Sequence, residues 1–160
     1  MIKSEDLFNL PTFVLNSPLV KAIQFLVMFG FLLLSGCNKN NINPVPSIPF
    51  DMTIDINLPS YNDLINVGGY AFVVGGSRGI IVYRSSIDEF VVFDRHSPED
   101  EEGVCPQPLI PDPDNFLILE DSCSNARFSL YDGSPQSGSS FGLRQYQTIY
   151  NGSNLLRIFN

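Results

Sequence analysis

The stretch of residues 93–135 decides the fold class: FDRHSPEDEEGVCPQPLIPDPDNFLILEDSCSNARFSLYDGSP. It contains two polar loops, one with Cys105 and the other with Cys123, and each loop follows a run of β-forming residues. Short runs of β-branched and aromatic residues bounded by turn residues are typical of strands. The stretch therefore predicts short strands separated by two long loops.

Further β-forming runs lie on either side of this stretch. Apolar and polar residues alternate over residues 51–58, which is the period of a half-buried strand. Asn151-Gly152 is a typical two-residue turn, and it predicts a hairpin of residues 146–150 with residues 155–159. The other predicted strands are residues 70–74, 79–84, 89–94, 116–120 and 126–131, and residues 59–66 form a connection with room for a helical turn. No run after Pro59 has a long helical period, so the sequence predicts an all-β domain over residues 51–160.

Two short boxes in the loops and the run that follows them resemble a known family. The boxes are Ser97-Pro98-Glu99 and Asp121-Ser122-Cys123-Ser124, and the run is Arg127-Phe128 followed by Tyr131-Asp132-Gly133-Ser134-Pro135. Together they resemble the Rieske iron–sulfur domains, and more narrowly the small Rieske-like lipoproteins of Bacteroidetes-type bacteria. The resemblance implies an antiparallel β sandwich with a loop-rich inserted subdomain at about residues 97–123, within cluster-type loops that span residues 94–133.

The resemblance also indicates where a cofactor would be held. Rieske domains bind a [2Fe–2S] cluster through Cys-x-His and Cys-x-x-His, with two Cys on one iron and two His on the other. The matching positions here are Ser97, Glu99, Asp121 and Ser124, whose hard oxygen atoms cannot replace two thiolates and two imidazoles. We therefore expect no cofactor, and a [2Fe–2S] electron-transfer protein with a different ligand set is the alternative.

The cysteines suggest a disulfide rather than a metal site. Many Rieske domains join their two cluster loops by a disulfide, and Cys105 and Cys123 lie where such a bridge would serve. Apart from Cys37 they are an even pair, and paired cysteines of exported proteins usually bond to each other. Closing a loop of about 19 residues would stabilise the fold by roughly 3 kcal/mol. A redox-active pair is the alternative, although the C-x-x-C spacing is missing.

The N-terminal segment resembles the export signal of a bacterial lipoprotein. Residues 22–34 are almost entirely apolar, a length that suits a signal peptide and is too short to span a bilayer. The sequence Leu34-Ser35-Gly36-Cys37 resembles a lipobox, in which the cysteine becomes lipid-modified. We expect residues 1–36 to be the signal, Cys37 the lipidation site and residues 37–50 a tether. The chain would then be anchored to a membrane of the bacterial cell envelope, on a periplasmic or outer face; the alternative is a buried helix of a cytosolic protein.

Charge and motifs exclude several other functions. The net charge of −8 argues against nucleic-acid binding, which needs clustered Lys and Arg. Membrane contact is therefore expected through the lipid on Cys37, and the sequence specifies no protein partner. His96-Ser97 lies outside any G-x-S-x-G elbow, so no enzyme is predicted. The acidic run of residues 99–102, with Asp112 and Asp114, is interpreted as a solvated face, with a Ca²⁺ site as the alternative.

Overall fold

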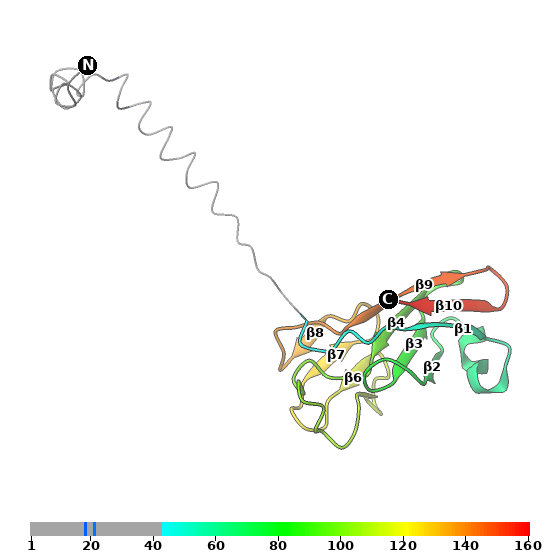
Figure 1. Cartoon of the computed structure of the whole chain (residues 1–160), viewed down its shortest axis with the longest axis horizontal. Coiled ribbons are helices and arrows are strands. Elements are labelled where there is room, and N and C mark those ends of the chain that lie inside the picture. Colours follow the sequence, from blue (N-terminus) through cyan, green and yellow to red (C-terminus); the bar gives the residue numbers. More distant parts are fainter. Residues whose placement is uncertain (1–17, 19–20, 22–42) are drawn as a thin grey trace, which may run out of the picture. The chain divides into compact units, whose positions relative to one another are not determined.

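The computed structural model describes residues 43–160, together with Pro18 and Lys21 (Figure 1). Cys37 and, apart from those two residues, the predicted signal segment lie outside this part of the chain. Within the described residues, no helix has both the length and the apolar character needed to cross a membrane. The regular secondary structure of the folded part is ten strands and one short 3-10 helix, so the prediction of an all-β domain is confirmed.

The larger sheet contains six antiparallel strands in the order β1-β10-β9-β4-β3-β2. Their bounds are β1 Asp51–Asp55, β2 Tyr70–Val73, β3 Ile80–Arg84, β4 Phe90–Asp94, β9 Gln145–Tyr150 and β10 Leu155–Phe159. A short 3-10 helix, η1 (Pro59–Ile65), joins β1 to β2, as the connection predicted there allowed. Pairing of β4 with β9, as between Val92 and Tyr146, joins the hairpin β9–β10 to β4 and makes one continuous sheet.

A smaller sheet is inserted in the sequence between β4 and β9. Its four antiparallel strands follow the order β5-β6-β7-β8. Their bounds are β5 Ile110–Pro111, β6 Ile118–Glu120, β7 Arg127–Ser129 and β8 Pro135–Ser137. The strands are short because the segment consists mostly of loops, as predicted for the inserted part.

Strand β3 lies between the two apolar clusters of the domain. Its alternate side chains Ile80 and Val82 join one apolar cluster with residues of β1 and β10. The side chains between them, Ile81 and Tyr83, join a second cluster with Phe128 and other residues of the smaller sheet. Successive side chains of a strand point to opposite faces, so β3 is buried on both sides. A continuous apolar run is the sequence pattern of such a strand.

Residues 43–49, which the sequence assigns to the tether, instead contact the domain, although residues 46–49 remain exposed. Val45 is almost completely buried, and its carbonyl oxygen accepts hydrogen bonds from Arg144. The side-chain amide of Asn43 donates to the Gly142 carbonyl at 2.8 Å. The prolines of this segment have no N–H to give to a sheet, and accordingly it adds no strand. The prediction of a tether up to residue 50 was therefore wrong from residue 43 onward.

The first strand is also less deeply buried than its alternating pattern suggested. Ile54 and Ile56 enter the core, but Met52 and Leu58 remain exposed. The strand ends at Asp55, so Leu58 precedes η1 and has no neighbouring strand to pack against. The alternation thus marks Ile54 and Ile56 as inward correctly, but it is wrong at Met52 and extends past the end of the strand.

Candidate functional site

The two polar loops meet at one disulfide. The first loop follows β4 and contains Cys105, and the second connects β6 to β7 and contains Cys123. The two sulfur atoms are bonded, with 6.1 Å between the Cα atoms, and this confirms the predicted bridge. Cys105 is buried, whereas Cys123 lies at the surface. The bridge therefore fastens the first loop to the exposed turn of the second.

Asp121 organises the second loop. Its Oδ1 accepts hydrogen bonds from the backbone N–H of Cys123 at 2.9 Å and of Ser124 at 3.4 Å. Its Oδ2 accepts a hydrogen bond from the Ser124 hydroxyl at 2.8 Å. Asn125, in a left-handed conformation with φ of 60°, donates its N–H to the Asp121 carbonyl and completes the turn. Asn tolerates this conformation better than most residues do.

The pKa of Asp121 is lower than its ordinary value of 3.8. Burial raises this pKa, because it disfavours the charged form, but hydrogen bonds from Ser97, Cys123 and Ser124 lower it by more. The carboxylate is thus ionised in the folded protein although it is almost inaccessible to solvent.

Three of the four positions that match Rieske ligands come together. Asp121 is hydrogen-bonded to Ser124, and the Ser97 hydroxyl lies close enough to help lower the pKa of Asp121. Glu99 is exposed instead, and its backbone N–H donates to the Ser97 hydroxyl at 3.2 Å. The carboxylates of Glu99 and Asp121, at two of the matching positions, are therefore not both part of this group. Asp121 is buried and is satisfied by the donors of its own loop.

The residues between the loops do not fit a [2Fe–2S] cluster. Cys105, Asp121 and Cys123 place three potential ligand atoms within 4.8 Å of one another. Both sulfurs are bonded to each other, so neither is available as a thiolate. His96 is buried with both ring nitrogens engaged: Nδ1 with the Ser77 hydroxyl at 2.7 Å and Nε2 with the Asp100 carbonyl at 2.5 Å.

The hydroxyl partner of His96 is Ser77 and not its sequence neighbour Ser97. A carbonyl oxygen can only accept a hydrogen bond, so in the neutral ring Nε2 carries the proton. Nδ1 then accepts from the Ser77 hydroxyl. This pair fastens the glycine-rich turn of residues 75–79 to the first loop. No local pattern could have predicted it, because 18 residues separate the two partners along the chain.

Sequence reasoning also missed Asp94, which is completely buried at the end of β4. Its carboxylate accepts hydrogen bonds from the backbone N–H groups of Ser77 at 2.6 Å and of His96 at 2.9 Å. It also accepts one from the Tyr146 hydroxyl at 2.9 Å. Burial raises the pKa of Tyr146, and the negative charge of Asp94 raises it further. Asp94 thus joins the glycine-rich turn, the first loop and β9.

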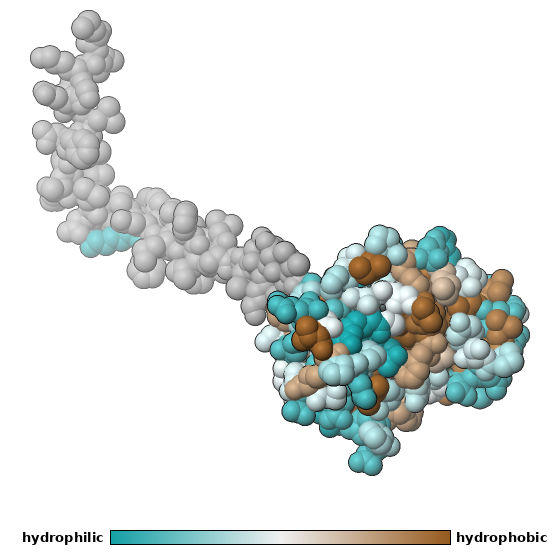
Figure 2. Space-filling model, turned by 60° about the horizontal axis from the view of Figure 1, so that its bottom comes forward, coloured by the Kyte–Doolittle hydropathy of each residue, from teal (hydrophilic) through white to brown (hydrophobic). Residues whose placement is uncertain are grey.

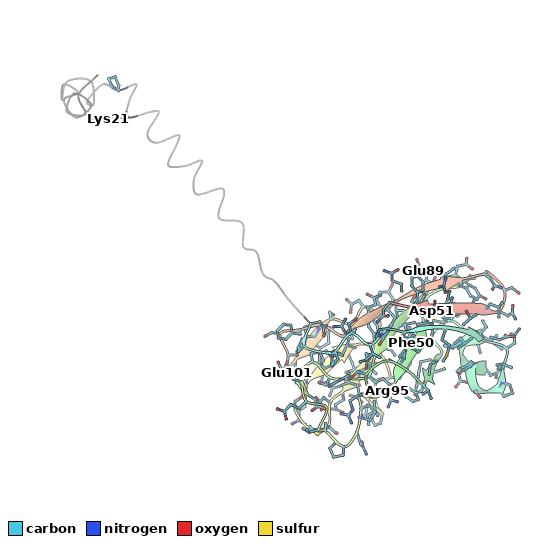
Figure 3. The ribbon with its side chains drawn as sticks, viewed as in Figure 1. Lys21, Phe50, Asp51, Glu89, Arg95 and Glu101 are labelled. Carbon is cyan, nitrogen blue, oxygen red and sulfur yellow. A yellow bond between two sulfur atoms is a disulfide. The ribbon has the colours of Figure 1, made fainter. Side chains whose placement is uncertain are left out.

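The acidic residues do not form a single solvated cluster. Asp100 is buried and pairs with Arg78 at 2.7 Å, and Asp112 pairs with Arg127. Glu99, Glu101 and Glu102 are exposed, and Figure 3 shows Glu101 at the edge of the domain. The interpretation as a solvated face therefore holds for the glutamates and Asp114 but was wrong for Asp100 and Asp112, which are buried. Asp100 and Asp112 are each paired with an arginine. These acidic residues therefore contain no group of free carboxylates that surrounds one point, as a Ca²⁺ site would need.

A row of aromatic side chains follows the edge strand β2. The Tyr70 ring contacts that of Phe72 at a centroid distance of 5.8 Å and stacks on that of Phe116 at 6.3 Å. The Arg95 guanidinium lies over the Phe72 ring at 4.0 Å. Phe72 and Phe116 remain nearly half exposed. Figure 2 shows, on the face in view, brown apolar patches among polar residues.

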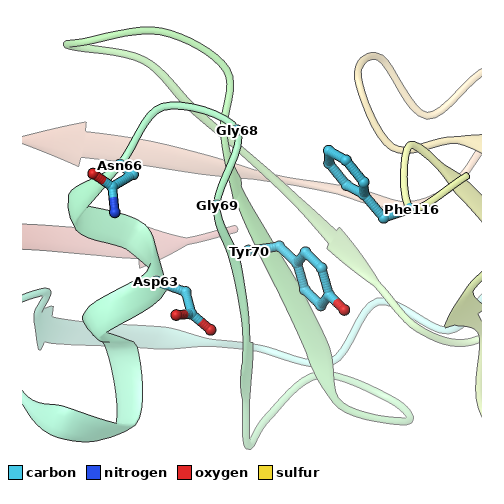
Figure 4. A pocket seen from close by; sticks show the side chains of 6 residues that line it. All are labelled: Asp63, Asn66, Gly68, Gly69, Tyr70 and Phe116. Carbon is cyan, nitrogen blue, oxygen red and sulfur yellow. The ribbon is translucent and has the colours of Figure 1, made fainter.

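A hollow lies at each end of this strand. The first, of about 350 Å³, is lined by Asp63, Asn66, Tyr70 and Phe116 and by the backbone of two glycines (Figure 4). The second, of about 440 Å³, lies where β2 leads into the glycine-rich turn and is bordered by Phe72 and Arg95. Both volumes are in the range of small-molecule sites.

In comparisons with family models, with curated proteins and with solved structures, nothing matches this chain.

Proposed function

We propose that this chain is a lipoprotein of the bacterial cell envelope whose folded part is a cofactor-free, Rieske-like module with a structural or binding role. One observation carries the cofactor-free assignment. The disulfide Cys105–Cys123 and the buried carboxylate of Asp121 fill the space between the two loops, where a cluster would need four soft ligands.

The order of the strands supports the Rieske-like part of the proposal. A small four-stranded antiparallel sheet is inserted between β4 and β9, and the two loops belong to this insertion. The boxes Ser97-Pro98-Glu99 and Asp121-Ser122-Cys123-Ser124 fall on those loops. Two contacts would hold the loops in place without a metal: Asp121 accepts the N–H groups of its own turn, and the disulfide holds the first loop to it.

The edge strand β2 supports a binding role over a purely structural one. Its aromatic row leaves Phe72 and Phe116 exposed between two hollows. Large apolar side chains gathered on the surface of a soluble domain commonly mark an interaction site. The lipoprotein part of the proposal depends on Leu34-Ser35-Gly36-Cys37, which lies outside the described residues.

Iron and acid-labile sulfide analysis tests the cofactor-free assignment. The protein is purified anaerobically from iron-replete cells, and we expect no charge-transfer absorption and no stoichiometric iron or sulfide. Two irons per chain would instead establish the alternative, a [2Fe–2S] electron-transfer protein.

A ligand-restoring variant tests the Rieske-like frame separately. It combines Ser97→Cys, Glu99→His, Asp121→Cys and Ser124→His with Cys105→Ala and Cys123→Ala. If the two loops form a Rieske-like frame, this variant should acquire a red-brown [2Fe–2S] chromophore on reconstitution. A folded variant that remains colourless would contradict the Rieske-like assignment, and circular dichroism shows whether the variant is folded.

A further inference from the structure

We propose that the hollow at the end of β2 binds a small organic anion, whose carboxylate or phosphate group meets Arg95 and whose apolar part lies on Phe72. This inference rests on the binding role proposed above and gives it a ligand class. Its test involves neither iron nor lipid, so the two proposals can fail separately.

Arg95 is held in position for an external anion. Its Nε donates to the Leu109 carbonyl at 2.8 Å, and its guanidinium is stacked on the Phe72 ring at 4.0 Å. Among the described residues, every buried side-chain nitrogen or oxygen has a hydrogen-bond partner. The two terminal nitrogens of Arg95 make no such bond with these residues and are therefore open to solvent. Figure 3 labels this side chain. A planar guanidinium with two free N–H groups matches a carboxylate or a phosphate.

The charges around the hollow favour an anion. Arg78 lies close enough to lower the pKa of Arg95, although burial lowers that pKa by more. The charge of Arg78 is balanced by Asp100 at 2.7 Å, whereas no carboxylate of the described residues lies within ion-pair distance of Arg95. Asp94 lies behind the glycine-rich turn, with its oxygens already engaged by donors. The guanidinium of Arg95 is thus the uncompensated charge on this wall of the hollow.

The glycine-rich turn leaves backbone exposed at the hollow. A Cβ on Gly76 would point inward, 2.4 Å from the buried Asp94 carboxylate and 2.5 Å from the Tyr146 hydroxyl, so glycine there makes room for these two groups and not for a ligand. Gly79 has φ of +88°, which disfavours other residues, and the space above it is bordered by the Arg95 side chain. A ligand in the hollow can therefore approach the backbone at Gly79, where a Cβ would have no neighbour closer than 3.7 Å.

The remaining wall is apolar and excludes a purely inorganic anion as the preferred ligand. Phe72 is 46% exposed and Val74 is 89% exposed, and both border the hollow. A ligand with a hydrocarbon part would remove this surface from water. A polyanion is disfavoured, because the chain as a whole carries a net charge of −8. The arrangement fits a small molecule with one anionic group.

Titration of the full chain by ¹⁵N NMR tests the proposal, with phenylacetate and phenyl phosphate as probes. We expect saturable shifts of the Gly75, Gly76 and Gly79 amides, with affinity at least about tenfold above that for benzyl alcohol, which has the ring but not the charge. Tighter binding of phenylacetate would identify a carboxylate ligand, and tighter binding of phenyl phosphate a phosphate ligand.

A matched pair of variants at an exposed position isolates the charge effect. Val74→Glu places a carboxylate beside the hollow, and both anions should bind to it about tenfold more weakly than to Val74→Gln, which has the same shape as the Glu variant but no charge. Arg95→Gln should also lose about tenfold. The proposal is overturned if neither anion gives a saturable shift, if benzyl alcohol binds equally well, or if Val74→Glu and Val74→Gln bind alike.

Discussion

Asp121 is the residue at which the loops differ most from a metal site. A ligand position would present its side chain to a cofactor, but Asp121 turns both oxygens toward donors of its own loop. Hydrogen bonds to an ionised acceptor contribute about 1.5–3 kcal/mol each. The buried charge is therefore compensated within a few residues of sequence.

We predict that Asp121→Asn lowers the free energy of unfolding at pH 7 by about 1–3 kcal/mol, because the amide nitrogen cannot accept the hydrogen bond of Ser124. Because the pKa of Asp121 is lowered, its contribution to the free energy of unfolding decreases as the pH falls. Folding favours the ionised form, so the contribution is present above the ordinary value of 3.8 and is lost as the pH falls through the folded-state pKa. Urea unfolding of both proteins from pH 7 to pH 3 measures this.

The control for this prediction is Asp88→Asn, at an exposed position in the turn between β3 and β4. Its free energy of unfolding should stay close to that of the unsubstituted protein across the same pH range. A difference between Asp121→Asn and the unsubstituted protein that grows as the pH falls would contradict the assignment of Asp121 as an ionised acceptor.

The sequence could identify the positions of this site but not their roles. Ser97, Asp121 and Ser124 were singled out by their place in the two boxes, and they do meet. Glu99 was singled out on the same ground and points to solvent. Asp94, whose partners lie 17 and 52 residues away at Ser77 and Tyr146, left no local pattern to find. Hydrogen bonds between distant segments are set by the packing of the sheets, which spacing along the chain does not reveal.

At the scale of elements, the disulfide is the covalent connection between the two loops. It joins residues 18 positions apart in sequence, and Cys123 is accessible at the surface. The six-stranded sheet has its own apolar cluster, which contains no residue of the two loops. The contribution of the bridge is therefore expected to be concentrated in the inserted part of the domain.

We predict that the double variant Cys105→Ala, Cys123→Ala loses about 3 kcal/mol of unfolding free energy, the amount expected for opening a loop of this length. Amide hydrogen exchange should show lost protection in residues 94–133, whereas the hairpin β9–β10 should keep its protection until global unfolding. Reduction of the unsubstituted protein by dithiothreitol should have the same effect. Equal loss of protection in both sheets would show that the bridge acts on the whole domain.

The predicted strands differ in how strongly their sequence marks them. β3 and β4 are continuous apolar runs because both of their faces are covered, and the sequence shows them clearly. β5 and β8 have two and three residues and contain Pro111 and Pro135. Such segments show no period of their own, and they become strands only because β6 and β7 lie beside them. They were accordingly missed.

At the scale of the whole molecule, the packing of residues 43–49 changes the expected geometry of anchoring. If Cys37 carries the lipid, only residues 37–42 separate it from the part that contacts the domain. Six residues in a fully extended chain span at most about 20 Å. The domain would then be held close to the membrane surface. A small anion would therefore reach the hollow beside Arg95 through the water layer next to the membrane.

We predict that the chain is processed at Cys37 and recovered with membranes, from which detergent releases it. Cys37→Ala should abolish incorporation of a labelled fatty acid and leave an unprocessed or released form, because no thiol remains at the position that would be acylated. The variant Cys105→Ala, Cys123→Ala is the matched control, since it lacks the other two cysteines and should still incorporate the label. If labelling persists in Cys37→Ala but disappears in the control, the fatty acid is attached to a cysteine of the domain and not to Cys37. A soluble, unlabelled protein with its leader cut elsewhere would refute the anchor altogether.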